Sequence, residues 1–172
     1  MKFIFLLIIV LALLNLTRSN LFIRSMVEVD KKIIEFLHKH HVLTLATTKN
    51  NIPYCANCFY VYHEEKNMLV FTTDYETKHA QDALGQNIVA GSIVLETNVI
   101  GKIQGLQFQG TMYEPKEDLL KRVKTRYLKR FPVAMLMKTH LWVIELSFLK
   151  FTDNRLGFGK KLIWGQEELE KI

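Results

Sequence analysis

The feature that most constrains the fold is a series of six short segments with strand character between residues 42 and 151. The segments are rich in β-branched and aromatic residues, and turn-forming or helical sequences separate them. The expected strands are Val42–Thr48, Tyr54–His63, Met68–Thr73, Ile88–Glu96, Ile103–Tyr113 and Leu141–Phe151. Consecutive strands joined by short turns predict an antiparallel barrel.

Helical periodicity predicts three further elements, at Glu28–His40, Thr77–Leu84 and Pro115–Arg130. Gly85 is expected to end the second helix. Gly105 and Gly110 interrupt the fifth expected strand and predict bulges or tight bends there. The tail from residue 152 is expected to be less regular. The chain is therefore predicted to be mainly β (α+β), with six antiparallel strands in a barrel and helices on its outside.

Composition limits the class of protein. With 172 residues, 49% of them hydrophobic and 23% charged, the chain has the size and apolar content of one globular domain. Two cysteines exclude a disulfide-stapled mini-protein. The net charge of +6 includes Lys2, Arg18 and Arg24, so it argues only weakly for nucleic acid, and we expect no nucleic-acid partner.

Residues 1–25 form a leader that is separate from the expected domain at 26–172. Lys2 is followed by twelve apolar residues, Phe3–Leu14, and then by the small residues Thr17 and Ser19. This pattern is typical of a secretory signal or a membrane anchor, although twelve helical residues span only about 18 Å. Translation from Met26 is the alternative. The protein is expected to be cytoplasmic in that case, and exported or membrane-anchored otherwise.

Two groups of potential metal ligands are interpreted as structural. In a strand, Cys55 and Cys58 would point to opposite faces with Cα atoms about 10 Å apart, too far for a disulfide. His38, His40 and His41 end the first helix, where they suit the negative end of its dipole. We therefore expect no metal site.

The helix near residues 116–130 is strongly basic. Its cations are Lys121, Arg122, Lys124, Arg126, Lys129 and Arg130. A nucleic-acid face is one interpretation, but an apolar stripe on the same helix favours a packed helix with a solvated outer face.

The junction between Phe71–Thr73 and the helix that starts near Thr77 predicts an anion site. Free backbone N–H groups at the start of a helix point toward the preceding loop, and Lys78 adds a positive charge. This combination suits a phosphate group near Lys78 and His79. A second candidate is the loop Asp153–Lys161, whose glycines, phenylalanine and cations could close over an anionic ligand.

These segments resemble a known family. Tyr75-Glu76-Thr77-Lys78 is similar to the T-N-Y-E-S-R-K stretch of pyridoxamine 5′-phosphate oxidases, and Asn154-Arg155-Leu156 is similar to their N-R-L motif. The expected strand order resembles their FMN-binding split barrel across residues 28–165. The closest resemblance is to a small bacterial branch of that superfamily, which has an N-C-F-Y strand and a D-N-R-L-G-F-G-K-K tail.

The resemblance implies a homodimer that binds two FMN molecules at the subunit interface and oxidises or reduces a small molecule. By position, the isoalloxazine ring would be bordered by Asn57, Phe59 and Tyr60, and the ribityl chain by Thr72 and Thr73. The phosphate would lie at Lys78 and His79, and the N-R-L motif includes Asn154 and Arg155.

Three departures from the oxidases bear on the substrate. Asn57 stands where they have arginine, Gly105 where they have a flavin-contacting glutamine, and Gly157 where histidine follows N-R-L. Gln107 shares a strand face with Gly105 and can replace the glutamine. FMN binding is therefore expected, vitamin B6 oxidation is not, and no residue stands out as a catalytic acid or base. A non-enzymatic protein that binds flavin or haem on the same barrel is the alternative.

Overall fold

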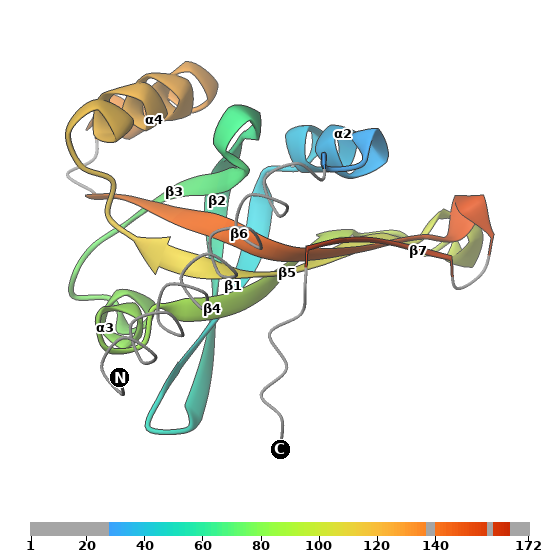
Figure 1. Cartoon of the computed structure of the whole chain (residues 1–172), viewed down its shortest axis with the longest axis horizontal. Coiled ribbons are helices and arrows are strands. Elements are labelled where there is room, and N and C mark those ends of the chain that lie inside the picture. The colour runs from blue at the N-terminus through green and yellow to red at the C-terminus, as the bar shows by residue number, and fades with distance from the viewer. Residues whose placement is uncertain (1–27, 137–139, 158–159, 166–172) are drawn as a thin grey trace, which may run out of the picture.

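The computed structural model describes residues 28–136, 140–157 and 160–165 (Figure 1). The expected leader lies outside these residues, as do Phe158 and Gly159 of the glycine-containing loop. The helices are α2 (Lys31–Lys39), α3 (Lys78–Gly85) and α4 (Glu117–Arg130). The strands are β1 (Val42–Lys49), β2 (Ile52–His63), β3 (Met68–Thr73), β4 (Ile88–Leu95), β5 (Gln104–Tyr113), β6 (His140–Asp153) and β7 (Lys161–Gly165).

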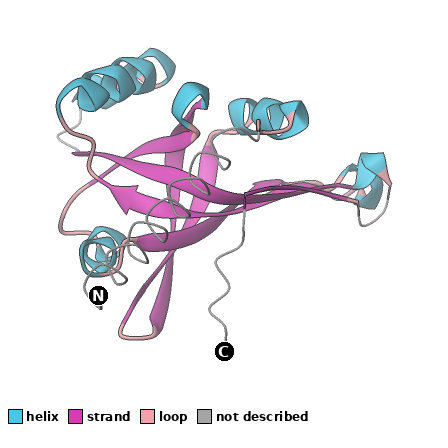
Figure 2. Ribbon diagram, viewed as in Figure 1, coloured by secondary structure: helices cyan, strands magenta, loops and turns pink. Residues whose placement is uncertain are grey.

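The strands form a closed antiparallel barrel. Their order is β3-β2-β1-β4-β5-β6-β7, and β3 also pairs with β6, which closes six of the strands into a ring. The helices lie on the outside of this ring, and β6 and β7 extend away from it (Figure 2). The predicted six-stranded barrel with peripheral helices is confirmed.

Two apolar clusters hold the barrel together. The larger fills the interior, where Tyr60, Phe71 and Trp142 are almost fully buried and where α2 contributes Ile33 and Leu37. The smaller lies between the barrel wall and α4, and consists of Val61, Met68, Val70, Val123, Tyr127 and Val143. The apolar stripe of the basic helix is therefore a packing surface, which confirms the interpretation of α4 as a packed helix.

The turn between β1 and β2 is shorter than predicted. Asn50 and Asn51 both have positive φ, 53° and 61°, as the two central residues of a tight hairpin turn require. Strand β2 therefore begins at Ile52 rather than Tyr54, and Pro53 lies opposite Thr48. The prediction that the second strand starts at Tyr54 was wrong, because two asparagines alone reverse the chain.

Two further expectations need correction. Residues Lys161–Gly165 of the tail form β7, which pairs with the end of β6. Gly110 does mark a bulge, since the β5–β6 register shifts between Gln109 and Gly110, but Gly105 keeps regular pairing. None of the helices in the described ranges is long and apolar enough to cross a membrane.

Candidate functional site

The junction between β3 and α3 leaves the start of a helix uncapped. Thr77 occupies the N-cap position of α3, but its hydroxyl donates to the carbonyl of Asp74 at 2.8 Å and caps no first-turn N–H group of the described helix. The first N–H groups of a helix have no partner within the helix. An anion at this position could therefore accept hydrogen bonds from the backbone, as the sequence predicts.

A buried imidazole lies beneath this junction. Nε2 of His79 is 2.7 Å from the hydroxyl of Thr73, and the Thr73 hydroxyl is 3.0 Å from that of Thr77. Burial lowers the pKa of His79, and Asp82 only partly opposes this effect, so the ring is neutral near neutral pH. His79 therefore orders the two threonine hydroxyls and does not present a positive charge to a ligand.

Lys78 already has a partner. Its ammonium donates to both carboxylate oxygens of Asp82 at 2.9 Å, and Thr47 donates to the same carboxylate at 3.1 Å. The Asp82 side chain is only 2% exposed, whereas that of Lys78 is 47% exposed. The hydrogen bond from Lys78 is the main reason that the pKa of Asp82 lies below its usual range. A phosphate bound here would share the ammonium with Asp82.

An exposed aromatic surface adjoins the junction. The hydroxyls of Thr72 and Tyr127 are 3.1 Å apart, and Tyr127 also lies 3.5 Å from the carbonyl of Phe59. Phe59 is 57% exposed, with its ring 5.7 Å from that of Phe131 and parallel to that of His41 at 5.9 Å. A planar ligand could stack here. Sequence reasoning missed Tyr127 because α4 is distant in the chain.

Tyr60 does not belong to this surface. Its side chain is fully buried in the barrel interior, and its hydroxyl donates to the carbonyl of Leu37 at 2.9 Å. Adjacent residues of a strand point to opposite faces, so Phe59 faces outward and Tyr60 inward. The expectation that both border a ligand was wrong for Tyr60.

Gln107 lines an open groove on the outer face of the sheet, and Asn57 contacts Thr44 in the wall of this groove. The groove has a volume of about 390 Å³, and its walls include Thr44 of β1, Cys55 of β2 and Gln107 of β5. Asn57 accepts a hydrogen bond from the Thr44 hydroxyl at 2.9 Å. The Gln107 amide nitrogen lies 3.9 Å from the position that a Cβ at residue 105 would occupy. The Gln107 amide therefore reaches the edge of the space that a side chain at position 105 would occupy.

Asn154 and Arg155 lie far from this junction in the same chain. Figure 1 shows the β6–β7 connection at the opposite end of the sheet from α3. Asn154 donates its amide to the carbonyl of Ile100 at 2.9 Å, and Arg155 pairs with the buried carboxylate of Asp153 at 2.7 Å. A single chain therefore does not bring the N-R-L motif and Lys78 into one site.

The groups interpreted as structural are dispersed. Cys55 is exposed and Cys58 is buried, both are free thiols, and burial raises the pKa of Cys58 to about 11. His38 bonds to Glu64 at 3.0 Å, whereas the rings of His40 and His41 pack on different phenylalanines. The residues with described positions contain no group of three or more histidine, cysteine or acidic side chains that could hold a metal ion.

Comparison with known sequences assigns the chain to a family. It matches no family model. It is 39% identical to a UPF0306 protein of Photorhabdus laumondii over 132 residues, which cover 77% of this chain and 92% of that protein. A UPF0306 protein of Cronobacter sakazakii is also 39% identical, over 79% of this chain and 94% of its own length. The chain belongs to the UPF0306 family.

Solved structures show which fold this UPF0306 chain shares. A heme-binding protein from Mycobacterium smegmatis superposes with a TM-score of 0.66 at 15% identity, over 81% of this chain and 60% of that one. An FAD-binding protein from Mesorhizobium loti superposes with a TM-score of 0.58 at 13% identity, over 72% of this chain and 94% of that one. A Listeria innocua protein assigned as a pyridoxamine 5′-phosphate oxidase superposes with a TM-score of 0.56 at 13% identity, over 70% of this chain and 94% of that one. The chain has the split barrel of the pyridoxamine 5′-phosphate oxidase-like superfamily, which confirms the resemblance.

Proposed function

We propose that this UPF0306 protein is a homodimeric flavoprotein that binds FMN and acts as an oxidoreductase on a small molecule. The observation that carries the proposal is the β3–α3 junction. There, the uncapped start of α3 lies beside the ammonium of Lys78, on a fold that flavin-binding proteins share. Backbone N–H groups and a lysine at a helix N-terminus are suited to a phosphate ester.

The residues at the junction fit an FMN phosphate that shares the Lys78 ammonium with Asp82. The buried carboxylate of Asp82 takes two of the three hydrogen-bond donors of the Lys78 ammonium. One donor and the helix N-terminus stay available to a phosphate. The outward-facing ring of Phe59 and the adjacent hydroxyl of Thr72 supply a surface for the remainder of the cofactor.

Dimerisation is supported by two features of the surface. Ile52, Phe59, Val94 and Ile163 each expose more than half of their surface on the strands of the sheet. A second copy would bury such side chains. The N-R-L motif could then meet the β3–α3 junction only if each came from a different chain, because they lie at opposite ends of one chain.

Bound flavin would supply the hydride and electron transfer, while the protein would position the ring and hold the phosphate. In this proposal, Lys78 and the start of α3 hold the phosphate, and Phe59 and Gln107 orient the flavin ring. We assign no catalytic acid or base.

Haem binding without catalysis is a second candidate. The Mycobacterium smegmatis protein with the same fold is heme-binding. His41 supports the idea, because its exposed imidazole lies against the exposed ring of Phe59 and could approach an iron atom from this surface.

The absorption spectrum of freshly purified protein distinguishes the two candidates, followed by titration with FMN, riboflavin and haemin. We expect one FMN per chain, with FMN bound more tightly than riboflavin because only FMN carries a phosphate. Light scattering should give twice the chain mass, and reduced nicotinamides should support turnover. Equal affinity for riboflavin and FMN would contradict the phosphate site. A monomer that retains FMN would contradict a cofactor at the subunit interface.

A further inference from the structure

A second cleft lies on the other side of α4 from Phe59. It is open to solvent, has a volume of about 800 Å³ and is lined by the end of α2, the end of β2, the short helix η1 (Glu64–Lys66) and α4. Ligand sites commonly have volumes of 300–1,000 Å³, so this cleft could hold a nucleotide-sized molecule. Tyr127 and Phe131 of α4 face Phe59 instead, which separates the cleft from the proposed flavin surface.

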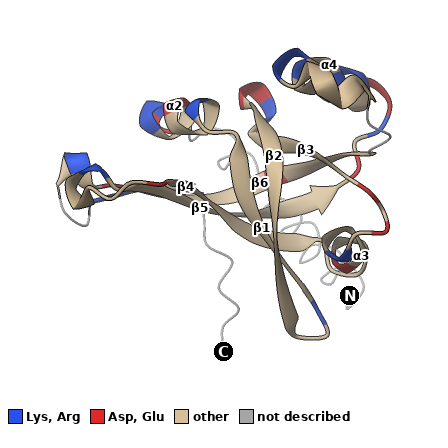
Figure 3. Cartoon of the chain, turned by 180° about the vertical axis from the view of Figure 1, so that it is seen from behind, with Lys and Arg blue, Asp and Glu red and all other residues tan. Residues whose placement is uncertain are grey.

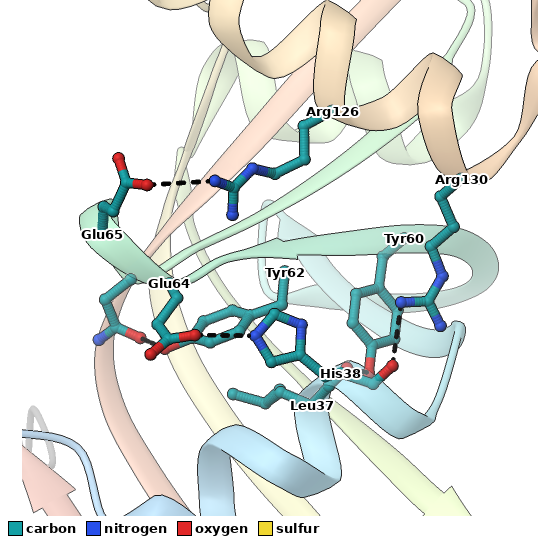
Figure 4. Close-up of polar contacts among 9 residues, drawn as sticks. Leu37, His38, Tyr60, Tyr62, Glu64, Glu65, Arg126 and Arg130 are labelled. Atoms are coloured by element: carbon teal, nitrogen blue, oxygen red, sulfur yellow. Dashed lines mark hydrogen bonds and ion pairs between the residues drawn. The ribbon is translucent and has the colours of Figure 1, made fainter.

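The cleft is strongly basic. Arg122, Arg126, Lys129 and Arg130 line it, and Glu65 is the one carboxylate among the described lining residues. Figure 3 shows that α4 carries several basic stretches, and Figure 4 shows Arg126 of α4 reaching Glu65 of η1. That contact is long, at 3.3 Å, and mostly exposed.

The other cations of the cleft carry charge that no carboxylate neutralises. Arg130 donates to the backbone carbonyls of His38 and His40 at 3.0 and 2.9 Å. In the ranges that the structure describes, neither Arg122 nor Lys129 forms an ion pair. The cleft therefore has a surplus of positive charge, and the Arg130 contacts hold α4 against the end of α2.

A buried polar atom also lacks a partner here. His63 lines the cleft and is only 3% exposed, yet its Nδ1 has no hydrogen-bond partner among the described residues. Burial lowers the pKa of His63, and the nearby Arg126 lowers it further. A buried polar atom without a partner is unfavourable and requires an explanation, such as a bound ligand.

We propose that this cleft binds a small molecule carrying two or more phosphate groups. Arg122, Arg126 and Lys129 follow one another at spacings of four and three residues, so they share a face of α4 and extend over about 10 Å of its axis. One phosphate cannot reach all three, whereas a diphosphate or triphosphate chain can. Guanidinium groups bind phosphate oxygens in pairs, and His63 offers a hydrogen bond to the deepest part of the ligand.

Calorimetric titration of the full chain with inorganic pyrophosphate, and separately with ADP, tests the proposal. The test variant is Arg122→Gln/Lys129→Gln, which removes two cations that no carboxylate pairs with. The matched control is Lys121→Gln/Lys124→Gln, which removes the same charge from α4 outside the cleft. We expect one pyrophosphate per chain, a loss of affinity of at least about tenfold in the test variant, and less than about twofold in the control. Both variants should bind FMN as the unmodified chain does.

Three results would overturn the proposal: no binding to the unmodified chain, an equal loss in the control, or competition between pyrophosphate and FMN. A single-stranded oligonucleotide that binds through the same cations while pyrophosphate does not would also overturn it, in favour of a nucleic-acid surface. His63→Gln provides a further check. It should weaken pyrophosphate binding without changing FMN affinity, and unchanged pyrophosphate affinity in a folded variant would remove His63 from the site.

Discussion

Replacement of Lys78 by alanine separates phosphate binding from structural support. The variant removes the ammonium that would face the FMN phosphate and leaves the start of α3 in place. Riboflavin has the same ring and ribityl chain but no phosphate. The variant should therefore bind FMN more weakly than the unmodified protein and bind riboflavin equally well.

The contacts of Lys78 determine the expected size of the effect. A hydrogen bond to a charged group contributes about 1.5–3 kcal/mol. Lys78 is half-exposed and already donates twice to Asp82, so solvent and the carboxylate both weaken its contact with a phosphate. We therefore expect the lower end of the range, which corresponds to about a tenfold rise in the dissociation constant for FMN.

The same substitution should also lower the melting temperature of the cofactor-free protein. It leaves the buried carboxylate of Asp82 with only the Thr47 hydroxyl as a partner, and an unpaired buried charge is destabilising. Adding Asp82→Asn to Lys78→Ala should restore most of the stability but not the affinity for FMN.

Fluorescence titration of FMN and riboflavin, with calorimetric melting, measures these effects, and Lys124→Ala on α4 is the control. If Lys78→Ala lowers the affinities for FMN and riboflavin equally, the substitution damages the fold and the phosphate assignment fails. If FMN affinity is unchanged while Lys124→Ala lowers it, the phosphate lies elsewhere.

Three further predictions concern the barrel itself. Iodoacetamide should alkylate Cys55 in the native protein and leave Cys58, whose pKa burial raises to about 11, unmodified until denaturant is added. Gly91→Ala should destabilise the fold by about 3 kcal/mol in urea unfolding, because its methyl group would meet a backbone carbonyl of β1, whereas Gly101→Ala has open space and should change little. Asp153→Asn should lower stability at pH 7. Because an arginine hydrogen bond lowers the pKa of Asp153 in the folded state, the difference from the unmodified protein should shrink as the pH falls below about 4.

The sequence predicted the number, order and approximate bounds of the barrel strands. This is possible because the alternation of apolar residues and the turn residues that mark a strand lie within a few neighbouring positions of the sequence. The β3–α3 junction was also predictable, since a strand end, a threonine and a lysine lie within seven residues. Even the inward orientation of Tyr60 follows from the alternation of strand side chains once Phe59 is placed outside.

Other features depended on pairings between distant segments. The tail became a strand because β6 extends far enough to pair with β7, which no local pattern in five residues establishes. The separation of Arg155 from Lys78 follows from the length and direction of the β6–β7 extension.

Local sequence patterns were enough to predict an antiparallel barrel with a basic packed helix and a potential anion site. The charges that are available to a ligand depend instead on how the elements pack. Asp82 lies beneath Lys78 and takes most of its hydrogen-bonding capacity, whereas α4 packs so that Arg122 and Lys129 line a cleft without carboxylate partners. A charge acts on a ligand according to its burial and its neighbours in space, and the fold alone brings those neighbours together.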